Sequence, residues 1–136
     1  MSKTFVIISC FFLLTGCKKT IEKIQKNAIV SAMTSGQCVI KKFVDNGTTK
    51  TTAFANYTFQ FHANKNVDAL LAGAVEKTGT WEGDAGTMTM TANFPGSVSP
   101  LSLLNGKWHI DNNSWTFVAA SQTVGSDTKV LRLEKL

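Results

Sequence analysis

Cysteine and histidine side chains are the most reactive groups in this 136-residue sequence, which contains three cysteines and two histidines. His62 and His109 have no histidine, cysteine or carboxylate at the spacing of a metal site, so we expect partly exposed strand residues. Catalysis would require one of them to meet a carboxylate in a cleft. The Gly-x-Ser-x-Gly and His-Glu-x-x-His patterns of hydrolases are absent. We therefore expect no enzymatic activity, and no bound metal or cofactor.

Cys17 closes a segment with the features of an export signal. Lys3 provides a positive start, residues 4–14 are almost entirely apolar, and the small Gly16 precedes the cysteine. The apolar stretch is shorter than the about 20 residues that span a bilayer, but it is typical of a signal peptide. We expect residues 1–16 to be removed and Cys17 to begin the mature chain. An ordinary secretory signal with a cysteine there by chance is the alternative.

The run Leu14-Thr15-Gly16-Cys17 resembles the lipobox of bacterial lipoproteins. This resemblance implies that the Cys17 thiol is alkylated with a diacylglyceryl group, that the leader is cut before it, and that the new amine is acylated. Two or three acyl chains hold a protein on a bilayer far more firmly than one. Lys18 and Lys19 stand where some lipoproteins carry an inner-membrane retention signal, so we expect an outer-membrane lipoprotein facing the periplasm.

The composition and cysteine usage suit one modest domain on a short tether. We divide the mature chain into residues 17–35, the anchored cysteine with a helix, and residues 36–136, the domain. A single arginine, Arg132, argues against a nucleic-acid partner. Lysines near Cys17 either contact anionic headgroups or belong to a solvated tether. With Cys10 removed and Cys17 lipidated, Cys38 remains unpaired, and we expect a buried apolar side chain there.

Apolar periodicity predicts a helix over Thr20–Met33, ended by Ser35-Gly36, and β-structure thereafter. Asn46-Gly47 and Asn112-Asn113 are expected to form hairpin turns. Short antiparallel strands at this spacing predict an all-β domain, an eight-stranded up-and-down barrel or a rolled sandwich. The expected strands are 37–45, 55–63, 67–71, 79–83, 87–94, 107–111, 114–120 and 128–135, with a helical turn at 101–104.

At three expected strands, a glycine at the start or just before it is followed two positions later by a larger side chain, which we expect to point inward: Gly36-Gln37-Cys38, Gly79-Thr80-Trp81 and Gly106-Lys107-Trp108. Gly-x-Trp at the first strand, after a short helix, is the lipocalin pattern; here Cys38 replaces the first tryptophan. With the runs 44–47, 51–61, 103–110 and 131–136, residues 36–136 resemble small bacterial lipocalin-like lipoproteins. That resemblance implies an eight-stranded barrel on a lipid anchor.

Large side chains of the barrel are the remaining candidates for contact with a ligand. An eight-stranded barrel either holds one small ligand or is filled by its own side chains. The sequence therefore leaves two functions open: binding a small apolar ligand, or a protein-facing role as an accessory factor or inhibitor at the envelope. It does not indicate an oligomeric state. The candidate ligand-binding residues are Phe59, Phe61, Trp81, Met88, Met90 and Trp108.

Overall fold

A computed structural model describes residues 30–136 of the chain. The expected leader, Cys17 and most of the expected helix lie outside the described residues. Residues 30–34 are helical, which agrees with the predicted C-terminal end of that helix. Gly36 then adopts a φ of 97°, a left-handed conformation that suits the residue after a helix. Within residues 30–136, no helix is both long and apolar enough to cross a membrane.

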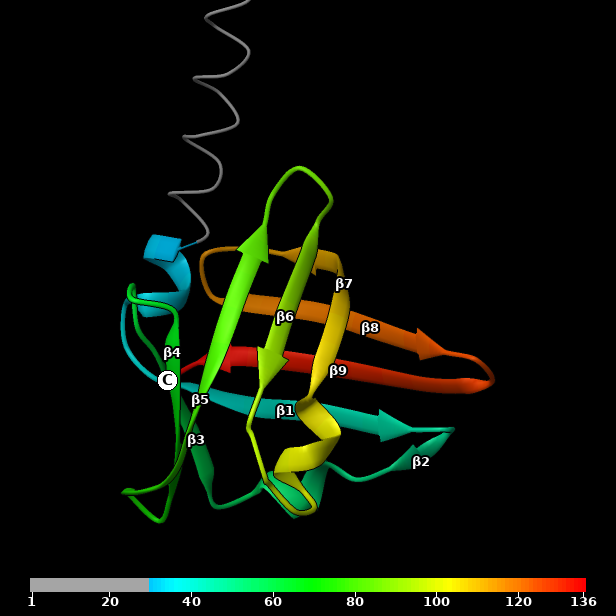
Figure 1. The fold of residues 1–136 in the computed structure, drawn as a ribbon, viewed down its shortest axis with the longest axis horizontal. Helices are drawn as coiled ribbons and strands as arrows, with labels where there is room; N and C mark the ends of the chain where they lie inside the picture. Colours follow the sequence, from blue (N-terminus) through cyan, green and yellow to red (C-terminus); the bar gives the residue numbers. More distant parts are fainter. Residues whose placement is uncertain (1–29) are drawn as a thin grey trace, which may run out of the picture.

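The described residues form a closed antiparallel barrel of eight strands with one extra short strand at its edge (Figure 1). The barrel strands pair in the order β1-β3-β4-β5-β6-β7-β8-β9, and β1 also pairs with β9, which closes the sheet. The extra strand, β2, pairs only with the end of β1. The strands are β1 (Cys38–Asp45), β2 (Thr48–Thr49), β3 (Tyr57–Phe61), β4 (Asn66–Leu71), β5 (Ala74–Asp84), β6 (Thr89–Asn93), β7 (Gly106–Asn113), β8 (Phe117–Val124) and β9 (Asp127–Lys135).

The predicted fold class is therefore confirmed, and so is the turn at Asn46-Gly47. Both of its residues have positive φ, 48° and 78°, as a two-residue hairpin turn of this twist requires. The short helical segment η2 (Leu101–Leu104) also lies where the sequence places a helical turn. A second one, η1 (Thr51–Phe54), was not predicted and buries Phe54 beneath β1.

Two hairpins differ from the sequence prediction. Strand β5 begins at Ala74 rather than Gly79, because Ala72 and Gly73 both take positive φ and form a tight turn directly after β4. The predicted turn at Asn112-Asn113 is wrong, since β7 continues to Asn113, which pairs with Val118. The chain reverses after it, at residues 114–116, where the Ser114 Oγ accepts a hydrogen bond from the Thr116 N–H at 3.1 Å.

Aromatic rings form a large part of the barrel core. The Phe43 ring lies 5.0 Å from Phe54 and 6.2 Å from Trp108 between centroids, and Phe61 meets Trp81 edge to face at 5.3 Å. Cys38, Trp81 and Trp108 are all buried, as expected, although Gly79 lies inside β5 and does not open it. Gly79 allows this packing, because a Cβ there would lie 2.3 Å from the Asn93 carbonyl oxygen.

Candidate functional site

The candidate ligand-binding residues converge on the barrel interior, but they leave little space there. Phe59 and Phe61 of β3, Met90 of β6 and Trp108 of β7 line one cavity of about 30 Å³. That volume holds little more than a water molecule, whereas small-molecule pockets measure about 300–1,000 Å³. The other two candidates stay outside this cavity's lining.

Trp81 and Met88 each have a structural environment of their own. Trp81 is 3% exposed, packs on Phe61, and donates from Nε1 to the His62 carbonyl oxygen at 3.0 Å. Met88 is half-buried between β5 and β6, where it packs against the core with a φ of 51°. Trp108 likewise donates from Nε1 to the Leu104 carbonyl oxygen at 2.9 Å. These hydrogen bonds hold both buried indoles in place.

His62 meets a carboxylate on the outer wall of the barrel. Its Nε2 lies 2.8 Å from Asp68 Oδ2, and the Thr78 hydroxyl donates to Asp68 Oδ1 at 2.6 Å. The hydrogen bond from Thr78, and then that from His62, lowers the pKa of the Asp68 carboxyl below its usual 3.8. The imidazole is 43% exposed on this wall, so the pair forms a surface hydrogen-bond chain across β3, β4 and β5.

His109 also has a carboxylate partner, and it faces a groove on the outer wall. Its Nδ1 lies 3.0 Å from Asp111 Oδ1. A hydrogen bond from Ser121, and then that from His109, lowers the pKa of Asp111. In a Ser-His-Asp triad the imidazole stands between serine and aspartate and takes the serine proton. Here the aspartate holds both partners, so this order does not activate Ser121.

The groove beside His109 opens where β7 and β8 separate. Their pairing ends at His109–Ser121 although β8 continues to Val124, and the resulting space of about 650 Å³ is lined by side chains of β6 to β9. Lys107 and Lys129 both contribute to this lining. Within residues 30–136, no group of three or more histidine, cysteine and acidic side chains is arranged to hold a metal ion.

Gln122 forms the floor of this groove, and sequence reasoning did not single it out. It is buried, and its Nε2 donates to the carbonyl oxygens of Asn105 and Lys107, both at 3.2 Å. The side-chain amide thereby donates to carbonyl oxygens that a paired strand would otherwise satisfy. A Cβ on Gly106 would lie 2.6 Å from that Nε2. The glycine was visible in the sequence, but its partner across the groove is fixed only by the register of β7 and β8.

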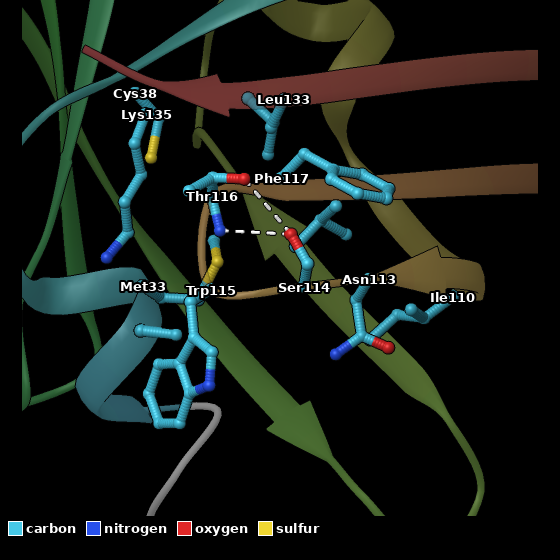
Figure 2. Close-up of a pocket in the computed structure, with 12 residues that line it drawn as sticks. Met33, Cys38, Ile110, Asn113, Ser114, Trp115, Thr116, Phe117, Leu133 and Lys135 are labelled. Carbon is cyan, nitrogen blue, oxygen red and sulfur yellow. Dashed lines mark hydrogen bonds between the residues drawn. The ribbon is translucent and has the colours of Figure 1, made fainter.

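A second, apolar depression lies at the end of the barrel where residues 30–37 join β1 (Figure 2). It measures about 30 Å³, and Met33, Cys38, Trp115 and Leu133 are among its lining residues. Figure 2 shows the Trp115 indole beside Met33, carried by the loop between β7 and β8. Trp115 is 64% exposed. Burial raises the pKa of the Cys38 thiol against the opposing charge of Lys135, which makes it a poor nucleophile.

The phenol of Tyr57 has a strongly raised pKa. Its hydroxyl donates to Glu76 Oε2 at 2.5 Å across β3 and β5. Burial, followed by the hydrogen bond and the negative charge of Glu76, raises the pKa of Tyr57 from 10.0 to about 12. Both Tyr57 and Glu76 lie away from the cavity and the groove, so we assign this pair to the structure of the wall.

A solved structure has a similar fold, whereas no protein-family model and no curated protein matches the sequence. It is the crystal structure, at 1.00 Å resolution, of a DUF4847 family protein from Bacteroides vulgatus. The two structures superpose with a TM-score of 0.56 and 13% sequence identity, over 79% of this chain and 97% of that one. The likeness shows a common barrel architecture, and that family has no known function.

Tyr57 is the chain's single tyrosine, so its ionisation can be followed by phenolate absorbance. We expect a titration near pH 12, read by rapid mixing before unfolding, since the pKa is raised to about 12. Because the folded pKa lies above the unfolded value, the associated stability is complete below pH 10.0 and lost as the pH rises through about 12. Glu76→Gln should lower this pKa while burial keeps it above its usual value; Glu134→Gln should leave it unchanged. A wild-type midpoint at the usual value would contradict the structure.

Proposed function

We propose that this chain is a bacterial envelope lipoprotein whose barrel is a non-catalytic, protein-facing accessory factor or inhibitor. The lipid on Cys17 holds it at the outer membrane, facing the periplasm. The observation that carries the protein-facing role is the filled interior, with a cavity of only about 30 Å³. The anchor is supported by the apolar segment and the run Leu14-Thr15-Gly16-Cys17 in the sequence.

The packing of the interior argues against a small apolar ligand there. Phe59 and Trp108 are 2% and 1% exposed, and each contacts another aromatic ring. Admitting a ligand of ordinary size would require displacing such side chains from a densely packed core. Protein interiors resist such repacking, because every displaced side chain loses its contacts. The barrel therefore presents its recognition surfaces on the outside.

The groove between β7 and β8 offers such an outer surface. Its space of about 650 Å³ carries the exposed side chains of Lys107, Thr123 and Val124 over the buried amide of Gln122. The mixture of cations, hydroxyls and one aliphatic residue suits the polar contacts of a protein partner. We place the partner contact in this groove.

The histidine and carboxylate pairs support a non-catalytic barrel. Asp68 and Asp111 each hold a histidine and a hydroxyl group by hydrogen bonds on the outer wall. In neither pair does the imidazole stand between the hydroxyl and the carboxylate, as general-base activation of that hydroxyl requires. These chains of hydrogen bonds are best explained as links between neighbouring strands.

Replacing Cys17 tests the anchor. Cys17→Ala should abolish labelling by a fatty-acid analogue and leave the leader uncleaved, because the thiol that is alkylated has been removed. Cys38→Ala is the matched control; it removes the buried thiol and should leave labelling and processing intact. Labelling of Cys17→Ala, or its unchanged association with membranes after processing, would show that the lipoprotein hypothesis is wrong.

A thermal-shift comparison tests the filled interior. Benzene and short fatty acids should leave the melting temperature of the wild type unchanged. Phe59→Ala should cost about 3–5 kcal/mol of stability and open a cavity, so that benzene raises the melting temperature of the variant alone. Stabilisation of the wild type by these ligands would instead favour the small-ligand function.

Charge reversal in the groove tests the protein-facing role. Cross-linking in intact envelopes should capture a partner with the wild type, and Lys107→Glu combined with Thr123→Glu should remove it, because both changes put negative charge on the groove wall. The matched control is Lys42→Glu with Thr49→Glu, at exposed positions of β1 and β2 outside the groove. Equal loss of the cross-linked partner in both variants, or the absence of a cross-linked partner with every protein including the wild type, would contradict partner contact in the groove.

A further inference from the structure

A small exposed patch, here called the mouth patch, lies at the end of the barrel that receives residues 30–37. It consists of Trp115, Lys135 and Leu136. Trp115 is 64% exposed and Leu136 77% exposed. Among the large apolar side chains that are exposed in residues 30–136, Trp115 is the one aromatic residue. An exposed indole has a substantial apolar surface and a polar N–H, and such residues gather where an apolar phase meets water.

Hydrogen bonds hold the mouth patch together across three segments. The Lys135 N–H donates to the Thr116 carbonyl oxygen at 2.9 Å, and the Leu136 N–H donates to the Gln37 carbonyl oxygen at 3.0 Å. The Lys135 ammonium donates to the Ser35 hydroxyl. The loop that carries Trp115 is closed by the Ser114 N–H, which donates to the Phe117 carbonyl oxygen at 2.9 Å. The patch is thus a defined surface built on strand ends.

The chain that leads to Cys17 leaves the described structure at this same end. Met33 and Trp115 line the same depression, and the first described residue, Val30, lies three residues before Met33. The segment from Cys17 to Val30 reaches at most about 45 Å when fully extended, and about 20 Å as the predicted helix. An anchor on Cys17 therefore tethers the barrel to the bilayer from the mouth, and the strands carry the opposite end farther away.

We propose that the mouth patch docks on the bilayer that holds the anchor. Trp115 and Leu136 enter the boundary between headgroups and acyl chains, and Lys135 meets anionic headgroups there. This inference rests on the proposed function, because it uses the lipid on Cys17. In the sequence, lysines 18, 19, 23 and 26 lie within ten residues of the expected anchor at Cys17 and would add positive charge near it. Docking turns the far end of the barrel away from the membrane.

The two other tryptophans make the docking measurable by fluorescence. Trp81 and Trp108 are 3% and 1% exposed, with their Nε1 atoms hydrogen-bonded inside the barrel. The emission that Trp115→Phe removes therefore belongs to the exposed indole. The full chain, lipidated in bacteria, is reconstituted into phosphatidylglycerol-containing vesicles whose phospholipids are brominated near the top of the acyl chains. We expect this difference emission to be quenched and shifted to the blue.

A matched reporter at the other end of the barrel serves as control. Val124, at the end of β8, is 64% exposed, as Trp115 is. In the Trp115→Phe background, Val124→Trp should give emission that brominated lipid does not quench, because the mouth alone contacts the bilayer.

Flotation of the same vesicles separates the proposed lipid anchor on Cys17 from the proposed docking of the mouth patch. If the chain floats and only the mouth indole is quenched, docking is supported. If the chain floats while Trp115 stays unquenched, or while both reporters are quenched alike, docking is overturned and the anchor stands; a protein partner for the mouth patch then becomes the better explanation. If the chain does not float with the vesicles, the anchor fails, and docking fails with it.

Discussion

The pairing of β1 with β9 is the constraint on which the rest of the structure depends. It runs from Cys38, opposite Lys135, to Asp45, opposite Lys129, and it brings the two ends of the described domain together. Closure pairs the outer strand β9 with β1 and so removes the two free edges that an open sheet of these strands would have. It also places the last residues of the chain beside residues 30–37. The mouth patch exists only because of this pairing.

Closure of eight strands also determines how much room the interior offers. A barrel of this size is just wide enough for side chains to fill, and Phe43, Phe59 and Trp108 fill it with their rings. Glycines adjust the fit where a side chain would collide, as Gly79 does against the Asn93 carbonyl group. Because the strands leave a space of only about 30 Å³ among these rings, we place the proposed recognition surfaces on the outer wall and at the ends.

The outer wall combines two kinds of polar surface. Asp68 and Asp111 each join a histidine to a hydroxyl group and thereby link adjacent strands. Between β7 and β8 the ladder stops, and Gln122 bridges the gap through its side-chain amide. The aspartate-centred hydrogen bonds link neighbouring strands at two places, whereas the gap bridged by Gln122 leaves an open groove. Because of this contrast, we propose partner contact at the groove and not at the histidines.

Local patterns in the sequence were sufficient for the class of fold, the number of barrel strands and the turn at Asn46-Gly47, because the alternation of Tyr57, Phe59 and Phe61 and this dipeptide act within a few residues. They also singled out Cys17 as the site of expected lipidation, since that reaction reads a short linear segment. The turn after Asn113, the long β5 and the floor formed by Gln122 were decided by pairing between strands. So was the choice between a hollow and a filled barrel. That choice depends on how closely the aromatic side chains of distant strands approach one another, and only the closed tertiary structure sets those distances.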